Sequence, residues 1–193
     1  MSYAGNTVAP MNHVIRSIRP DEWARVKELR LAALQDPVAH LAFLETYEDA
    51  AARHDAFWQE RAAGAAEGST TRQQFVAEGE GGAWAGSVTV LVEEGGSRDP
   101  FGGVIEQRQG HLVGVFVRPE HRGSGVGVTR ALFDAALQWS WGIGLDRVRL
   151  FVHEKNTRAE AFYRKAGFVP TGGTVKAPGV AGELELEFAI TRP

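Results

Sequence analysis

Six residues between a very apolar segment and a helical pattern carry the clearest chemical signal in this sequence. The stretch Arg122–Gly127 reads RGSGVG, with glycines at three alternate positions. A strand that passes through such a turn into a helix leaves several backbone N–H groups unpaired at the helix N-terminus, which favours anions. Glycines let an anion approach those groups, and the Arg122 guanidinium adds a charged fork of donors. The stretch therefore predicts a cradle for a pyrophosphate.

Two familiar phosphate motifs do not fit this turn. A P-loop requires a lysine after its glycines, and GSGVGVT has none. The dinucleotide fingerprint has another glycine spacing and an acidic residue at the end of the following strand, where this sequence has FVHEKN. An ordinary strand-to-helix turn remains the alternative.

A second group of candidate residues lies in the stretch NTRAEAFYRKAGF, Asn156–Phe168. Thr157 and Glu160 fit the T-x-x-E capping box of a helix N-terminus, and this assignment leaves the Asn156 amide free for another partner. Tyr163 falls on the apolar face of the same helix. Because tyrosines on such faces are commonly core residues, spacing alone leaves the role of Tyr163 open.

The two stretches together resemble a known family. Val115–Val128 with RGSGVG is similar to the acyl-CoA motif [Q/R]-x-x-G-x-[G/A] of the GNAT family of N-acetyltransferases. The pattern N…A..FY.K.GF resembles the next motif of that family at its usual distance, so the resemblance covers Leu112–Phe168. It implies an enzyme, an acyltransferase that moves an acetyl group from acetyl-CoA to an amine of a small molecule, peptide or protein. A non-catalytic acyl-CoA sensor and a transferase for a longer acyl group are the alternatives.

The resemblance also implies how the cofactor is held. Acetyl-CoA would serve as the co-substrate without a metal, with its pantetheine arm along the backbone of one strand and its pyrophosphate in the glycine turn. The implied cofactor-binding residues are Val115, Phe116, Val117, Arg122, Gly123, Ser124, Gly125, Val126, Gly127, Val128 and Asn156. The alternatives are core packing for the three strand residues and a plain turn for Asn156.

Two residues are the candidates for acid and base. By the resemblance, Tyr163 is the general acid that protonates the departing CoA thiolate, and a phenol pKa of about 10 suits a thiol leaving group. Some relatives place a glutamate base at the start of the apolar strand, and ungapped counting puts His111 at that position. An imidazole titrates near pH 6.5, which suits a base at neutral pH. Glu106, Glu120 and a chain of waters are competitors for this role.

Composition narrows the chemistry further. The 193 residues include no cysteine, so a cysteinyl acyl-enzyme cannot form and direct transfer in a ternary complex is the simplest expectation. The formal net charge of −3 argues against a nucleic-acid partner. The chain contains no apolar run long enough for a membrane span, and MSYAGNTVAPMNH does not resemble a secretory signal. We therefore expect a cytoplasmic protein with no membrane partner. Since homodimers are frequent in the family that the sequence resembles, a homodimer is one oligomeric state that the resemblance implies.

The elements that must position these residues are predicted from periodicity and from turn residues. We expect residues 1–13 to form a flexible tail and residues 14–193 a single N-acetyltransferase domain of α/β class. The pattern indicates one central mixed sheet, and the resemblance implies that it is mostly antiparallel, with one parallel pair, and flanked by about four helices. Expected strands cover 14–18, 72–79, 83–94, 111–119, 146–152 and 182–191, and a further strand begins after the last helix. Expected helices cover 20–36, about 49–63, about 125–141 and a segment within 156–168.

Two smaller features complete the sequence prediction. Gly114 interrupts the most apolar strand, which indicates a bulge or a close backbone approach. The resemblance places the acceptor against the first helices and the loop DPVAHLAFLETYED between them, where Glu45, Glu48 and Asp49 could attract a cationic amine. Solvated loop charges are the alternative, and the sequence does not identify the acceptor.

Overall fold

One mixed sheet organises the protein. The computed structural model describes residues 13–123, 127–178 and 182–193. The predicted tail therefore lies outside the described residues except for His13, as do Ser124, Gly125 and Val126 of the glycine turn. Seven strands are arranged in the order β1-β2-β3-β4-β5-β7-β6, and the β4–β5 pair is parallel whereas the other described neighbours are antiparallel. The predicted fold class is confirmed.

The elements follow the predicted order. The strands are β1 Val14–Ser17, β2 Arg72–Glu78, β3 Trp84–Glu93, β4 Gln109–Val117, β5 Arg147–His153, β6 Val169–Lys176 and β7 Leu184–Thr191. The helices are α1 Trp23–Leu34, α2 Tyr47–Ala51, α3 Asp55–Ala65, α4 Val128–Gly142 and α5 Thr157–Lys165. Short 3-10 turns lie at η1 Pro20–Glu22, η2 Ala39–Leu41, η3 Glu80–Gly82 and η4 Pro119–His121.

The helix predicted over about 49–63 is two helices in the structure. The Thr46 hydroxyl accepts a hydrogen bond from the Asp49 backbone N–H at 3.1 Å, so α2 starts earlier than predicted. His54 then has an extended backbone before α3 begins. The apolar spacing alone cannot reveal such a break, because the two helices bury their residues against the same neighbours.

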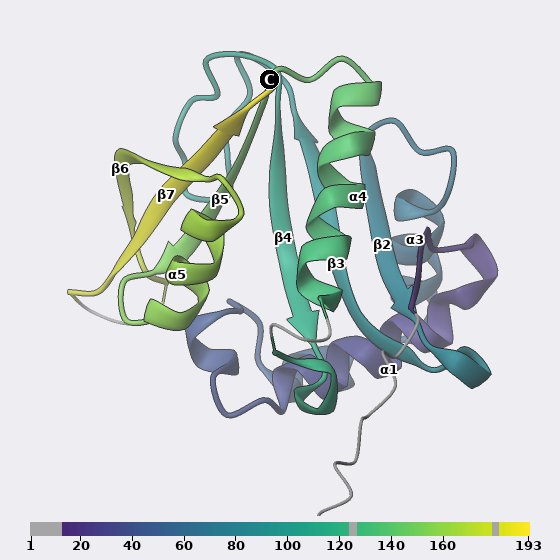
Figure 1. The fold of residues 1–193 in the computed structure, drawn as a ribbon. Coiled ribbons are helices and arrows are strands. Elements are labelled where there is room, and N and C mark those ends of the chain that lie inside the picture. The colour runs from purple at the N-terminus through teal and green to yellow at the C-terminus, as the bar shows by residue number, and fades with distance from the viewer. Residues whose placement is uncertain (1–12, 124–126, 179–181) are drawn as a thin grey trace, which may run out of the picture.

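Two hydrophobic cores lie on opposite faces of the sheet. On one face, Leu132 and Phe133 of α4 pack with strand residues and with α5. On the other face, Trp58 of α3 packs with Val26 and Leu29 of α1. Figure 1 shows α4 lying across β3 and β4, with α1 and α3 behind the sheet. Burial on both faces explains why the central strands are so apolar.

The two parallel strands pair only at one end. The register joins Gly110 to Val148 and His111 to Arg149, whereas β4 continues to Val117. A bulge shapes β4 beyond this point: Thr89 of β3 faces Val113 and Ser87 faces Phe116, and Gly114 has a φ of 62°. The bulge predicted at Gly114 is therefore confirmed. Figure 1 shows β4 and β5 running apart toward the ends where α4 and α5 begin.

The helices are short compared with the thickness of a membrane. Within the described residues, no helix combines the length and the apolar character needed to cross a lipid bilayer.

Candidate functional site

A cavity of about 720 Å³ opens where β4 and β5 separate. Its walls come from the end of β4, the glycine turn, the start of α4, one side of α5 and residues between α1 and α2. The sequence-predicted residues on these walls are Val115, Phe116, Val117, Arg122, Gly123, Gly127, Asn156 and Tyr163. The fold thus brings most of the predicted cofactor residues to one cavity together with the predicted acid.

The other predicted residues lie elsewhere. Val128, the first residue of α4, is buried in the core beneath that helix and does not line the cavity. His111 is also buried, nearer the paired end of β4, and is not on the cavity wall. Ser124, Gly125 and Val126 lie outside the described residues.

The described glycines of the turn have backbone conformations that favour glycine. Gly123 has a φ of 117°, and Gly127 has a φ of 69° at the N-cap of α4. A side chain at either position would strain the backbone. The left-handed Gly127 also explains why α4 begins at Val128 rather than near Gly125.

Arg122 is held by its neighbours in the folded chain. Its Nε donates to the Val117 carbonyl at 2.7 Å, its Nη2 pairs with Asp36, and its guanidinium lies 5.7 Å from the Phe116 ring centroid. The Asp36 side chain is only 5% exposed. Burial would raise the pKa of Asp36, but hydrogen bonds from Arg122 and from the Val38 backbone N–H outweigh it and lower that pKa.

This ion pair reduces the positive charge that Arg122 can offer to an anion in the cavity. Sequence reasoning missed Asp36, which balances much of the charge that Arg122 was expected to offer. The other cationic side chains on the wall are Arg130, Arg158 and Lys165. Asp36 follows α1 with no spacing signal that relates it to Arg122, so only the fold reveals the pair.

Asn156 caps α5, which corrects the assignment of that cap to Thr157. The Asn156 Oδ1 accepts a hydrogen bond from the Ala159 N–H at 3.2 Å, and Thr157 is the first helical residue. Asparagine and threonine are both good N-caps, so neighbouring candidates are hard to separate by sequence alone. The Asn156 amide nitrogen makes no hydrogen bond to a described residue, which leaves a donor on the cavity wall.

Tyr163 combines a buried ring with a position on the cavity wall. The ring stacks on Phe133 with their centroids 5.7 Å apart. Burial raises the pKa of Tyr163 to about 12, and the negative charge of Glu185 contributes to this rise. The phenol therefore carries its proton at neutral pH, which is the form a general acid requires.

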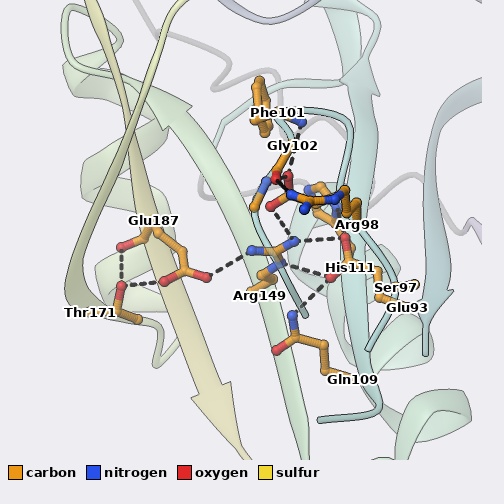
Figure 2. A network of polar contacts seen from close by, with 12 residues as sticks. Glu93, Ser97, Arg98, Phe101, Gly102, Gln109, His111, Arg149, Thr171 and Glu187 are labelled. Atoms are coloured by element: carbon orange, nitrogen blue, oxygen red, sulfur yellow. Dashed lines mark hydrogen bonds and ion pairs between the residues drawn. The ribbon is translucent and has the colours of Figure 1, made fainter. Parts of the chain in front are cut away.

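His111 belongs to a buried polar network on the other side of the sheet from α4 and α5. Its Nδ1 lies 2.9 Å from Glu93 Oε1, and Arg149 donates to both oxygens of Glu93 at 2.8 Å. Arg149 also donates to Asp99 at 3.1 Å and to Glu187 at 3.2 Å. Figure 2 shows Arg149 between Glu93 and Glu187, with His111 beside Glu93. The network joins β3, β4, β5, β7 and the loop after β3.

Glu185 is a further residue that sequence reasoning missed. It lies on β7, half-buried, and burial raises its pKa to about 7. In the sequence it reads only as one polar position in the alternating pattern LELEF. Its electrostatic effect on Tyr163 could not be inferred without the fold.

Comparisons with known proteins agree on one family. A model of the acetyltransferase (GNAT) family matches residues 23–168. A mycothiol acetyltransferase of Beutenbergia cavernae is 43% identical over 67 residues, which cover 35% of this chain and only 22% of that protein.

Solved structures resemble the fold over nearly the whole chain. The Salmonella typhimurium protein yncA with its cofactor acetyl-CoA has a TM-score of 0.64 and 18% identity, covering 93% of this chain and 94% of that one. The Vibrio cholerae spermidine N-acetyltransferase in complex with CoA and spermine has a TM-score of 0.60 and 19% identity, covering 93% of this chain and 95% of that one. At these identities the structures support the fold and not the substrate.

Proposed function

The chain belongs to the acetyltransferase (GNAT) family, and on that premise we propose that it transfers an acetyl group from acetyl-CoA directly to an amine of a small molecule, peptide or protein. One observation carries the proposal. A single cavity is lined by the unpaired end of β4, the glycine turn, Asn156 and Tyr163. One cavity wall that carries a free strand edge, a glycine turn and a phenol supports this assignment of cofactor strand, anion site and acid.

The cofactor end of the cavity fits acetyl-CoA. Along Val115–Val117 the edge of β4 that faces β5 has no strand partner among the described residues, so its backbone can pair with the amides of a pantetheine arm. The glycine turn and the N-terminus of α4, a helix of 15 residues, favour the pyrophosphate. We propose that Arg122 shapes this turn through its contacts with Asp36 and Val117. The positive charge that attracts the phosphates would then come from Arg158, Lys165 and the backbone N–H groups.

The transfer itself needs an acid and a nucleophilic amine. The amine nitrogen forms a bond to the thioester carbonyl carbon, the carbon–sulfur bond breaks, and the Tyr163 phenol gives its proton to the departing thiolate. Because the chain has no cysteine, no cysteinyl acyl-enzyme intervenes. Initial-rate plots with both substrates varied should intersect, and parallel lines would contradict direct transfer.

For the base that takes the proton from the amine, the sequence-predicted candidate is His111, whose contact with Glu93 would hold the ring so that Nε2 accepts a proton. Since His111 does not line the cavity, a proton would have to reach it through water. His111→Gln should then lower kcat and leave acetyl-CoA affinity unchanged.

Two measurements test the proposed function. Calorimetry with acetyl-CoA should give binding to the wild type, strong weakening in Arg122→Glu, and no change in Arg108→Glu, an exposed control outside the cavity.

A thiol reagent should then report CoA release with a panel of amines that includes spermidine and short peptides, without background from the chain. Tyr163→Phe should retain binding and lose about 100-fold or more in kcat. Binding without release for every amine would indicate a sensor instead.

A further inference from the structure

We infer that the amine acceptor carries one ammonium group on an apolar body, and that diamines and polyamines are poor acceptors. The inference rests on the proposed acetyl transfer and names the class of its acceptor. It differs from the sequence expectation that Glu45, Glu48 and Asp49 attract a cationic amine. The reason is the side of the loop between α1 and α2 that faces the cavity.

The cavity is lined from both faces of the sheet. Val115 and Val117 pack with the core that contains α4 and α5, whereas Phe116 packs with the core that contains α1 and α3, and all three line the cavity. The glycine turn and α5 form the wall on the first face, where the cofactor contacts are proposed. Residues that follow α1 form the wall on the second face, behind the sheet in Figure 1. The acceptor therefore reaches the thioester from the second face.

The wall on this second face is apolar. Val38, Ala39, Ala42 and Phe43 line the cavity, and Phe43 also packs against the core that contains α1 and α3. With Phe116 at the end of β4, they form a continuous choice of hydrocarbon contacts for an acceptor. Removing apolar surface of the acceptor from water against this wall favours binding.

The acidic side chains of the same loop have other partners. Glu45 accepts hydrogen bonds from Arg53 Nε at 2.9 Å and from Arg30 Nη2 at 3.3 Å. Asp49 accepts one from the Thr46 hydroxyl at 2.8 Å. None of the three carboxylates that the sequence suggested for the acceptor lies on the cavity wall.

A second ammonium on the acceptor would find no free carboxylate on the described wall. Asp36 is the one carboxylate among the described wall residues, and Arg122 already binds it. The aromatic rings on this side also have cations beside them, since the Arg30 guanidinium lies 4.5 Å from the Phe43 ring centroid and that of Arg122 lies 5.7 Å from the Phe116 centroid. Burying an unpaired charge at such a wall is unfavourable.

The reacting nitrogen itself suits an apolar wall, because it attacks in its neutral form. An alkylammonium has a pKa of about 10.4, and apolar surroundings lower the pKa of an amine by disfavouring its charged form. The ammonium gives its proton to water, and the neutral nitrogen then bonds to the carbonyl carbon as the carbon–sulfur bond breaks. The wall that rejects a second ammonium thus promotes the nucleophilic form of the first.

Two acceptors of matched size test the inference. Hexylamine and pentane-1,5-diamine have chains of equal length and differ only in a terminal methyl or ammonium group. With the wild type and acetyl-CoA at pH 7, CoA release should give a kcat/KM for hexylamine at least about tenfold above that for the diamine. Equal values, or a preference for the diamine, overturn the inference and leave the proposed function intact.

A pair of variants tests whether the loop wall causes this preference. Ala42 is exposed and lines the cavity, and glutamate and glutamine at that position differ in charge but hardly in size. Relative to Ala42→Gln, Ala42→Glu should shift the ratio of the two kcat/KM values toward the diamine by at least about threefold. An identical ratio in the two variants overturns the inference.

Leu44→Glu is the matched control for position. Leu44 is 61% exposed and does not line this cavity, so the added carboxylate should leave the wild-type ratio unchanged. If Leu44→Glu shifts the ratio as far as Ala42→Glu does, the charge acts from outside the cavity and the inference is overturned.

The rival occupant of the apolar wall is a longer acyl chain. With hexylamine as the acceptor, hexanoyl-CoA should be a poorer donor than acetyl-CoA, because its chain would compete with the acceptor for the wall. Faster turnover with hexanoyl-CoA would assign the wall to the donor and overturn the inference. If the wild type releases no CoA with any amine, the proposed function fails and the inference fails with it.

Discussion

Replacing Arg149 with leucine should destabilise the protein by about 3–5 kcal/mol at pH 7, the usual cost of removing one partner from a buried ion pair. Arg149 donates to Glu93, Asp99 and Glu187 over distances of 2.8–3.2 Å. The side chains of Arg149 and Glu93 are only 7% and 9% exposed. Without the guanidinium, three carboxylates remain close together with little access to water. Their mutual repulsion adds to the lost hydrogen bonds.

The size of this effect can be checked against Glu93 alone. Burial by itself would raise the pKa of Glu93, but hydrogen bonds from His111 and Arg149 outweigh it and lower the pKa from 4.5 to about 2. At 1.36 kcal/mol per pKa unit, this corresponds to about 3 kcal/mol of stability, which Arg149 shares with His111. Because the folded-state pKa is lowered, the contribution is present above pH 4.5 and is lost as the pH falls toward 2. The difference between wild type and variant should shrink over the same range.

Urea denaturation at pH 7 and at pH 3.5 measures both the loss and its pH dependence. Arg108→Leu is the matched control, since Arg108 is 40% exposed and its partner Glu94 is 63% exposed, and it should cost less than about 1 kcal/mol. If Arg149→Leu does not fold, Arg149→Lys keeps the charge and should show a smaller loss of the same sign. A loss below about 1 kcal/mol at pH 7, or an equal loss at both pH values, would refute the reasoning.

Two further predictions concern the walls of the cavity. Asn156→Ala removes the N-cap of α5 and should cost about 1 kcal/mol, which lowers the melting temperature by about 2–4 °C in calorimetry; no change would mean that Thr157 takes over the cap. Gly86→Ala would place a Cβ 2.5 Å from the Phe116 carbonyl oxygen and 2.9 Å from Val117 Cγ2, so β4 must shift. It should cost about 1–3 kcal/mol in urea denaturation and weaken acetyl-CoA binding in calorimetry, whereas wild-type affinity would show that β4 does not contact the cofactor.

Local patterns were enough to predict the framework of the site. Gly123 and Gly127 mark a turn that few other residues can form, and Gly114 marks a bulge for the same steric reason. Apolar spacing predicted α1, α4 and α5, although it joined α2 and α3. These features depend on neighbours in the sequence, so they can be read without knowing the fold.

The partners of the polar groups were decided only by the tertiary structure. Asp36 meets Arg122 across 86 positions, and Arg149 meets Glu93 across 56. Glu187 pairs with Arg147 and Arg149, whereas Glu185 forms no hydrogen bond or ion pair with a described residue, and no local pattern distinguishes the two. Charge and hydrogen bonding act through space, so the sequence identified the family and predicted a cofactor turn and an acid, while the fold decided which charges are neutralised.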